Sequence, residues 1–323
     1  MVQRKRYLEK LKKLKDKQII KVVTGVRRCG KSTLLKQFQE YLKSCGVEER
    51  QIISINFEDV SNEPLMDYKA LHDFVVKQLI PGKMTYVFLD EVQAVPQYQK
   101  AVDSLFIRDN VDLYITGSNA YLLSGELATL LSGRFIEIQM LPFSFAEYYE
   151  FVGGDKRDAW QAYFKNGGFP FAARLDDDEI RKDYLMGIYS TVLLKDIVAR
   201  KGISNVPLLE SVIKYLFDNI GSIVSSKKIA DSLTSFGRRT SPITVENYIK
   251  ALQESFVLYK ASRYDIRGKQ HLKSLEKYYL VDVGLRRLLL GNKNADIGHL
   301  LENIVYLELI RRGFSVDIGK VGD

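Results

Sequence analysis

A glycine-rich segment near the N-terminus most strongly limits what this chain can fold into. Residues 25–32 read Gly-Val-Arg-Arg-Cys-Gly-Lys-Ser, a complete G-x-x-x-x-G-K-[ST] pattern. In such a loop the backbone N–H groups surround the phosphates of a nucleotide, the lysine reaches the β- and γ-phosphates, and the serine hydroxyl ligates Mg²⁺. The pattern therefore predicts a phosphate-binding loop that takes ATP and Mg²⁺; the alternative is a glycine turn that binds nothing.

The residues on both sides of this loop have the character that such a site requires. Residues 19–24 are rich in β-branched side chains, which predicts a strand. Apolar residues then recur at helical spacing between Ser32 and Tyr41. A strand, a glycine loop and a helix in this order direct a helix N-terminus at a phosphate group. The predicted nucleotide contacts are Gly25, Val26, Arg27, Arg28, Cys29, Gly30, Lys31, Ser32 and Thr33.

Two adjacent carboxylates follow a second apolar run. Residues 86–89 predict a buried strand, and Asp90 and Glu91 come directly after it. Phosphoryl transfer uses one carboxylate to hold the Mg²⁺ shell, and its neighbour can orient or deprotonate the attacking water. We assign the metal role to Asp90, together with Ser32, and the catalytic role to Glu91. The alternative is a pair of solvated residues at the end of a strand.

Two more polar residues are candidates for catalysis. The strand predicted at residues 112–117 ends near Asn119, whose amide could reach the γ-phosphate or the water, with Ser118 as the second choice. Arg134 precedes the strand predicted at 135–138 and could stabilise charge in the transition state, within its own chain or in a neighbouring subunit. The alternatives are a turn at the end of a strand and a surface arginine paired with a carboxylate.

Four segments together resemble one large prokaryotic family of AAA+/STAND-type P-loop ATPases, usually described as ATP-binding proteins. They are residues 24–35, Phe-Leu-Asp-Glu-Val-Gln at 88–93, Ile-Thr-Gly-Ser-Asn at 115–119 and Leu-Ser-Gly-Arg-Phe at 131–135. The resemblance implies that Asp90 and Glu91 form the Walker B element, that Asn119 is sensor 1, and that Arg134 is a candidate arginine finger. It also implies a helical lid after the sheet.

The expected fold class is α/β, a P-loop NTPase parallel sheet of the AAA+ kind followed by smaller units. We expect a basic N-terminal helix at 1–17, a P-loop ATPase core at 18–140, a helical lid at 141–204, a winged helix at 205–270, and a partial restriction-endonuclease-like (PD-(D/E)xK) domain at 271–323. In the lid, Gly167-Gly168-Phe169-Pro170 resembles the Gly-x-Pro element of STAND ATPases, which implies that Pro170 packs near the adenine. The alternative is a turn between helices.

Residues 205–270 predict the winged helix because three amphipathic helical patterns precede a strand-like segment and a turn. Ser241 and Pro242 predict the N-terminus of the third helix. Residues 205–273 contain eleven Lys/Arg and six Asp/Glu, which indicates a surface that could face phosphates. The candidate DNA contacts are Arg238, Arg239, Lys250, Arg263, Arg267 and Lys269. The alternative is a winged helix that only braces the molecule.

The last segment resembles the opening of the restriction-endonuclease-like domain of that family. The resemblance matches Glu302, on a helix at 298–311 that we expect to be a core helix, to the helix glutamate of that fold. A strand is predicted at 314–318. The pattern should continue to a strand with a metal-binding Asp and a Glu/Gln-x-Lys, and the sequence ends at Asp323 before them. We therefore expect an incomplete and inactive nuclease-like part, or a shortened chain.

Charge and composition limit where this chain is expected to be located and which partners it is expected to bind. The net charge is +8, and residues 1–17 alone contain eight Lys/Arg against two acidic residues. This segment predicts an amphipathic helix with Tyr7, Leu8, Leu11 and Leu14 packed inward; the alternative is contact with nucleic acid or a membrane surface. No run of 18 apolar residues and no secretory signal is present, and there are two cysteines, so we expect a cytoplasmic chain without a membrane span.

The expected function is Mg²⁺-dependent binding and hydrolysis of ATP that drives a conformational change in the winged helix and C-terminal module. The partners would be ATP and ADP, DNA through the winged helix, and a second copy of the chain. One alternative is a nucleotide switch of slow turnover that regulates DNA or a protein partner. Another is an ATP-gated nuclease in a longer parent chain.

Overall fold

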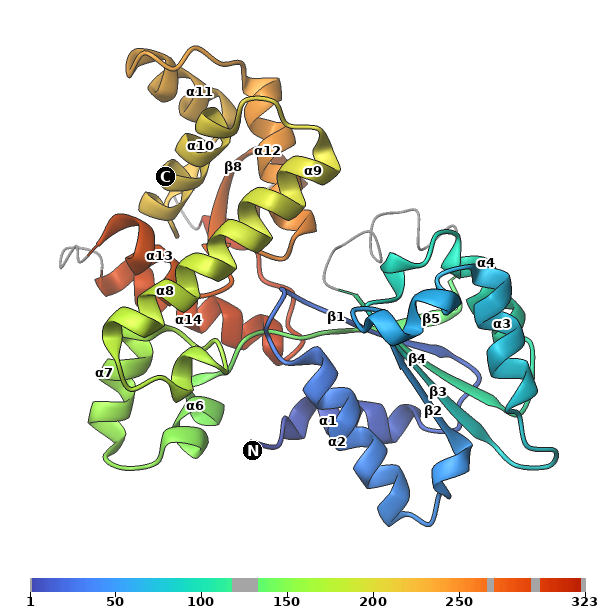
Figure 1. Ribbon diagram of the computed structural model, residues 1–323. Helices are drawn as coiled ribbons and strands as arrows, with labels where there is room; N and C mark the ends of the chain where they lie inside the picture. Colours follow the sequence, from blue (N-terminus) through green and yellow to red (C-terminus); the bar gives the residue numbers. More distant parts are fainter. Residues whose placement is uncertain (1, 118–132, 266–269, 292–296, 321–323) are drawn as a thin grey trace. The chain divides into compact units, whose positions relative to one another are not determined.

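The computed structural model describes residues 2–117, 133–265, 270–291 and 297–320 (Figure 1). The chain divides into two compact units. The first comprises Met1–Gly25 and Gly30–Met140, and the second comprises Val26–Cys29 and Leu141–Asp323.

A five-stranded parallel sheet forms the centre of the first unit. Its strands are β1 (Ile20–Thr24), β2 (Ile52–Asn56), β3 (Thr85–Asp90), β4 (Val111–Gly117) and β5 (Phe135–Gln139). They lie in the order β2-β3-β4-β1-β5, and every neighbouring pair is parallel. All carboxyl ends therefore meet at one edge of the sheet. The predicted α/β fold with a parallel sheet is confirmed.

Helices cover both faces of this sheet (Figure 1). They are α1 (Lys5–Leu14), α2 (Lys31–Ser44), α3 (Tyr68–Lys77) and α4 (Tyr98–Phe106), with short 3₁₀ helices at Glu49–Gln51, Val60–Leu65 and Val92–Ala94. On one face, α3 and α4 contribute Leu71 and Leu105 to a buried aliphatic core. On the other, Phe38 of α2 packs against Phe88 and Tyr114 of the strands. The central strands β1, β3 and β4 are buried along their whole length, which explains the apolar run that precedes Asp90, whereas the outer strands β2 and β5 are only partly buried.

The basic N-terminal segment forms an amphipathic helix, as predicted. Tyr7, Leu8 and Leu11 of α1 are buried, and Leu14 is half-buried. The Lys10 ammonium donates to the Glu137 carbonyl at 2.8 Å, which ties the helix to β5. Much of the positive charge of α1 therefore surrounds an apolar face that packs within the first unit.

The second unit begins with helices whose N-termini are capped by side chains. They are α6 (Phe145–Val152), α7 (Lys156–Asn166) and α8 (Asp178–Ile188), followed by a π-helical stretch at Tyr189–Asp196 and α9 (Ile197–Lys201); a 3₁₀ turn spans Ala172–Arg174. Ser144 and Glu147 form a capping box, and Asp155 and Asp177 cap α7 and α8. Such caps satisfy N–H groups that the helix itself leaves without partners.

A mixed group of helices and strands follows. Its elements are α10 (Val206–Asp218), β6 (Ile223–Val224), α11 (Ser226–Ser235), α12 (Pro242–Glu254), β7 (Leu258–Asp265) and β8 (Gln270–Leu280). β8 pairs antiparallel with both β6 and β7. Ser241 caps α12 and Pro242 occupies its first turn, as the sequence predicted.

The C-terminal segment differs from the prediction in two ways. α13 (Val283–Leu290) and α14 (Ile297–Arg311) follow β8. We expected α14 to be a core helix. However, Val305 is 56% exposed, and the residues that α14 buries are chiefly Asn303, Tyr306 and Leu307. Apolar residues lie around most of the surface of α14, but only one face of this helix is buried against the other described elements. The strand predicted at 314–318 is β9 (Ile318–Lys320), which lies later in the chain than predicted. It pairs parallel with β7 and so extends the sheet that β7 belongs to.

Candidate functional site

The glycine loop connects the carboxyl end of β1 to the N-terminus of α2, as predicted. Gly25, Arg28 and Gly30 have φ angles of 138°, 68° and 104°. Gly30 is the N-cap of α2, and no side-chain cap hydrogen bond is formed there. Because L side chains rarely adopt this conformation, glycine is the residue that fits position 30. The first turn of α2 is thus a helix N-terminus of the kind that binds anions.

Lys31 turns back over the loop. Its side chain is 4% exposed, and its ammonium donates to the Gly25 carbonyl at 3.2 Å. The same ammonium lies 3.5 Å from the Glu91 carboxylate. Ser32, the next residue of α2, is exposed, and Thr33 is half-buried. The predicted loop lysine and catalytic glutamate are therefore in direct contact.

Asp90 and Glu91 lie at the end of β3, and Thr116 on the neighbouring strand β4 binds both residues. The Thr116 hydroxyl donates to the Asp90 carboxylate and accepts the Glu91 N–H at 2.9 Å. Glu91 itself has a φ of 56°, a left-handed conformation that a glutamate adopts only when its surroundings hold it. Both residues are buried, at 8% and 7% exposed. Thr116 thus fixes the backbone turn that orients the pair.

Thr116 was missed from the sequence, although a signal was available. Leu89 and Ile115 are register partners on the parallel strands β3 and β4, so Thr116 stands beside Asp90. A hydroxyl at the end of the strand adjacent to the two carboxylates could have suggested this bond. Gln93 was also missed: its amide donates to the second oxygen of Glu91 at 2.5 Å.

The donor set fits a magnesium nucleotide. Lys31 supplies a cation for phosphate, while the Ser32 hydroxyl and the Asp90 carboxylate are oxygen ligands of the type that Mg²⁺ prefers. Within the described part of the chain, no group of three or more His, Cys, Asp or Glu could hold a metal ion. A magnesium ion here would therefore depend on nucleotide phosphates and water for its remaining ligands.

Arg134 lies at the amino-terminal ends of the strands, whereas the loop lies at their carboxyl ends. Its carbonyl accepts the N–H of Ile20 at the start of β1, and its guanidinium lies 5.6 Å from the centre of the Phe106 ring. The loop begins beyond Thr24, at the other end of the same strand. A five-residue strand spans about 16 Å. Arg134 is therefore remote from the phosphate loop of its own chain.

The remaining predicted residues are dispersed. Asn119, Arg267 and Lys269 lie outside the described residues. Val26 and Cys29 are buried, Arg27 is half-buried and Arg28 is exposed. Pro170 is half-buried in the second unit, next to the fully buried Phe169.

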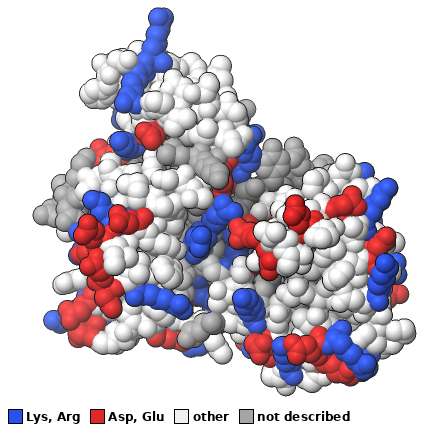
Figure 2. All heavy atoms as spheres, in the orientation of Figure 1, with Lys and Arg blue, Asp and Glu red and all other residues white. Residues whose placement is uncertain are grey.

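Among the candidate DNA contacts, Arg238 has an internal role. Its guanidinium donates to the Pro207 carbonyl at 2.5 Å and to the Ser211 hydroxyl, so it holds the start of α10. Arg239 and Lys250 are exposed and Arg263 is half-buried. In Figure 2, basic side chains project from the part of the second unit that Figure 1 labels α11.

Glu302 on α14 is bound by its neighbours. The Lys277 ammonium lies 2.8 Å from its carboxylate and the Tyr279 hydroxyl donates at 2.6 Å. Burial raises the pKa of Glu302, but the hydrogen bonds from Lys277 and Tyr279 outweigh it, so the pKa is lowered overall. The carboxylate thus has a structural role in the described residues.

Comparisons with known proteins agree with this geometry. A family model described as an AAA domain matches residues 17–149, and one described as a domain of unknown function (DUF8612) matches residues 157–296. An uncharacterized protein of Haemophilus influenzae is 43% identical over 332 residues, which cover 99% of this chain and 82% of that protein. The uncharacterized protein MJ1544 of Methanocaldococcus jannaschii is 30% identical over 310 residues, covering 91% of this chain and 67% of that protein.

Among solved structures, the Walker-type ATPase PABY2304 of Pyrococcus abyssi has a similar fold. It has a TM-score of 0.56 and 15% sequence identity, and the match covers 90% of this chain and 96% of that one. The first unit is thus an AAA-type P-loop ATPase-like domain. The chain belongs to the family that contains the Haemophilus and Methanocaldococcus relatives. In the described part of the chain, no helix is both long enough and apolar enough to span a membrane.

Proposed function

We propose that this chain binds ATP with Mg²⁺ and hydrolyses it. The observation that carries the proposal is the convergence of Lys31, Asp90 and Glu91 at the carboxyl ends of the strands, where the Thr116 hydroxyl links the Asp90 carboxylate to the backbone N–H of Glu91. A cation, a metal-binding carboxylate and a second carboxylate able to orient water are the groups that phosphoryl transfer requires.

Each residue has a distinct part in this proposal. Lys31 and the N–H groups at the start of α2 bind the phosphates, while Ser32 and Asp90 hold the metal. Bound Mg²⁺ would neutralise charge on the phosphate oxygens. Glu91 orients the attacking water and accepts its proton. Asn119 contacts the γ-phosphate or the water, and Pro170 packs near the adenine.

The contact between Lys31 and Glu91 suggests how binding prepares the site. The Lys31 ammonium is shared between the Gly25 carbonyl and the Glu91 carboxylate. Nucleotide phosphates carry more charge than either group and would draw the ammonium toward themselves. Glu91 would then lose that attraction and could hold a water molecule. Substrate binding and activation of the base would thus be coupled.

Arg134 acts in this proposal on the nucleotide of a second copy of the chain. Its distance from its own loop argues against a role within the chain, whereas an arginine at the far edge of the sheet can reach the site of an adjacent subunit. Such an arginine stabilises the charge of the transition state. The proposal therefore requires a homo-oligomer during turnover.

We infer that α10, α11, α12 and the strands β6 to β8 form a winged helix that changes position with the nucleotide state. The order helix, strand, two helices and two antiparallel strands supports this inference. The exposed Arg239 and Lys250 are the described side chains best suited to phosphates of DNA. Arg238 is not included in this set, because its guanidinium binds the start of α10.

Phosphate release from Mg-ATP by the purified chain tests the proposal, measured with and without duplex DNA. Lys31→Ala and Glu91→Gln should both abolish release, whereas Lys36→Ala, an exposed lysine on the same helix α2, should leave it unchanged. Stimulation by DNA that is lost in Arg239→Ala/Lys250→Ala would support the winged-helix interface. Tight binding of ATP without turnover in the wild type would instead favour a nucleotide switch.

A further inference from the structure

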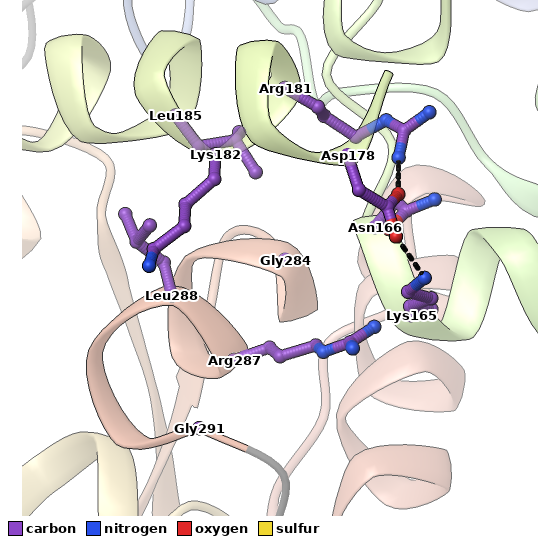
Figure 3. Close-up of a pocket in the computed structure, with 10 residues that line it drawn as sticks. All are labelled: Lys165, Asn166, Asp178, Arg181, Lys182, Leu185, Gly284, Arg287, Leu288 and Gly291. Carbon is purple, nitrogen blue, oxygen red and sulfur yellow. Dashed lines mark hydrogen bonds and ion pairs between the residues drawn. The ribbon is translucent and has the colours of Figure 1, made fainter. Parts of the chain in front are cut away.

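A cavity in the second unit is separate from every residue assigned above. It lies between α7, α8 and α13, and its volume is about 330 Å³ (Figure 3). Cavities of about 300–1,000 Å³ are the size that binds small molecules. The wall between α7 and α13 is tightly packed, since a Cβ on Gly284 would lie 2.3 Å from the Asn166 carbonyl oxygen. The cavity therefore has at least one rigid side.

Positive charge dominates the lining. Four cations line the cavity, Lys165, Arg181, Lys182 and Arg287, against a single carboxylate, Asp178. Asp178 pairs with Lys165 at 2.5 Å and also with Arg181, and these partners lower its pKa. One carboxylate cannot neutralise four cations, so three positive charges remain in excess.

Arg287 and Lys182 are the cations that this carboxylate does not pair with. Within the described residues, neither side chain has a hydrogen bond or an ion pair to another group. Arg287 is half-buried, and in Figure 3 its guanidinium extends from α13 toward Lys165. Like charges held near one another repel, and a bound anion would remove that cost. The guanidinium fork is suited to an oxyanion because it donates two parallel hydrogen bonds.

Aliphatic side chains line the opposite side of the cavity, together with the Lys182 ammonium (Figure 3). Leu185 of α8 and Leu288 of α13 line it, away from the ion pairs of Asp178 (Figure 3). A ligand that fills the cavity would thus meet Lys165, Arg181 and Arg287 at one end, and aliphatic side chains with a single ammonium at the other. A strand of nucleic acid, whose backbone is charged throughout, matches this division poorly.

We propose that this cavity binds a small phosphate monoester with an apolar group. The phosphate contacts Arg287, Arg181 and Lys165, and the apolar group packs on Leu185 and Leu288. A phosphate monoester carries nearly two negative charges at neutral pH, which suits the excess of cations better than a carboxylate does.

Asp178 competes with the ligand for its cations. Its side chain is 61% exposed, so it can turn toward water when phosphate arrives. Removing its charge should therefore strengthen binding, which is the reverse of the effect expected for a structural residue. Asp177, the N-cap of α8, remains in place, so the helix keeps its cap in the Asp178→Asn variant.

Isothermal titration of the full chain with phenyl phosphate tests the site, in a Lys31→Ala background that weakens the phosphate loop. We expect saturable binding that Arg287→Gln weakens about tenfold, the loss of a charge-assisted hydrogen bond. Asp178→Asn should tighten it several-fold, and the exposed Arg157→Gln on α7 should not change it. Phenol and inorganic phosphate should each bind more weakly than phenyl phosphate.

Two results would overturn the proposal. One is an affinity for phenyl phosphate that Arg287→Gln leaves unchanged. The other is weaker binding in Asp178→Asn, which would mean that the carboxylate supports the ligand and does not compete with it. Because the Asp178→Asn variant is expected to gain affinity, a general loss of folding cannot imitate the predicted result.

Discussion

The Lys31 ammonium lies 3.5 Å from the Glu91 carboxylate, and the two side chains are only 4% and 9% exposed. Each group belongs to a different part of the expected chemistry, phosphate binding in one case and water activation in the other. In the proposed mechanism, a bound nucleotide draws the Lys31 ammonium away from the Glu91 carboxylate. Glu91 is thus a competitor for Lys31 in the structure described here.

Replacing Glu91 should separate binding from turnover. In Glu91→Gln the amide no longer attracts the ammonium, so Mg-ATP should bind as tightly as in the wild type or a few-fold more tightly. Hydrolysis should fall by about 100-fold or more, since general-base catalysis contributes about that much. Equilibrium binding of a fluorescent ATP analogue measures the first quantity. A clear loss of affinity in this variant would show that Glu91 helps to hold the nucleotide.

Loss of the Thr116 hydroxyl should slow turnover, because this hydroxyl orients Asp90 and Glu91. Thr116→Val removes the hydroxyl that Asp90 and the Glu91 N–H share, at nearly constant volume. A lost hydrogen bond to a charged group is equivalent to about tenfold or more in rate if it acts in the transition state. We expect the maximal turnover rate to fall by about tenfold, and Thr116→Ser to restore it. Equal defects in the serine and valine variants would point to packing as the role of this side chain.

Arg134→Ala chains and Glu91→Gln chains should restore each other's activity when they are mixed in one oligomer. Arg134→Ala and Glu91→Gln chains should each be inactive alone, but a mixture can place an intact arginine beside a site with an intact glutamate. Random pairing in an equal mixture gives about a quarter of wild-type turnover. Phosphate release by the mixed chains measures this. Activity in Arg134→Ala alone would remove the arginine from the proposed mechanism.

A buried ion pair between β1 and β4 should make the first unit sensitive to the loss of one of its two charges. Lys21 and Asp112 are almost fully buried and pair directly, and Tyr114 and the Asp16 N–H also bind the carboxylate. Lys21→Met would leave that carboxylate without its cation, which costs about 3–5 kcal/mol. Urea unfolding followed by a probe in the first unit measures the loss. A smaller loss in Lys21→Met/Asp112→Leu, which removes both charges, would support the same account.

Asp282 should make the stability of the second unit depend on pH. Complete burial raises its pKa to about 7, against the opposing effect of hydrogen bonds from the N–H groups of Gly168, Gly284 and Leu285. The folded state then binds a proton more readily than the unfolded state, whose carboxyl has an ordinary pKa near 3.8. The contribution to the free energy of unfolding is therefore full below about pH 4 and is lost as the pH rises toward 7.

Comparison with Asp282→Asn isolates this effect. The asparagine has no titration in that range, so the wild type should lose stability relative to the variant between pH 5 and pH 8, by at most about 1.4 kcal/mol per pH unit. Denaturant unfolding of both proteins at the two pH values measures it. A difference in stability that is the same at pH 5 and pH 8 would show that Asp282 keeps one charge state throughout.

The parts of the site that the sequence predicted depend on short patterns. The loop at 25–32 and the pair Asp90 and Glu91 are contiguous in the chain, and each follows a strand that the apolar runs identified. Local structure alone therefore indicated which edge of the sheet they occupy. The order of the strands and the parallel register were then enough to bring the two elements together.

What the sequence did not reveal depends on contacts between distant segments. The Thr116 bridge requires the register of β3 and β4, and the role of Arg238 requires the packing of its turn against α10. The exposure of α14 could not be predicted because its apolar residues surround the helix. The cationic cavity combines α7 and α8 with α13, which lies about a hundred residues further along the chain.

The central claim is that the residues around Lys31 and Glu91 hydrolyse ATP. The most direct test is phosphate release from Mg-ATP by the wild type beside Glu91→Gln, with Glu63→Gln, an exposed glutamate after β2, as the matched control. We predict steady turnover in the wild type and in Glu63→Gln, and none in Glu91→Gln. Turnover at the wild-type rate in Glu91→Gln would contradict the mechanism.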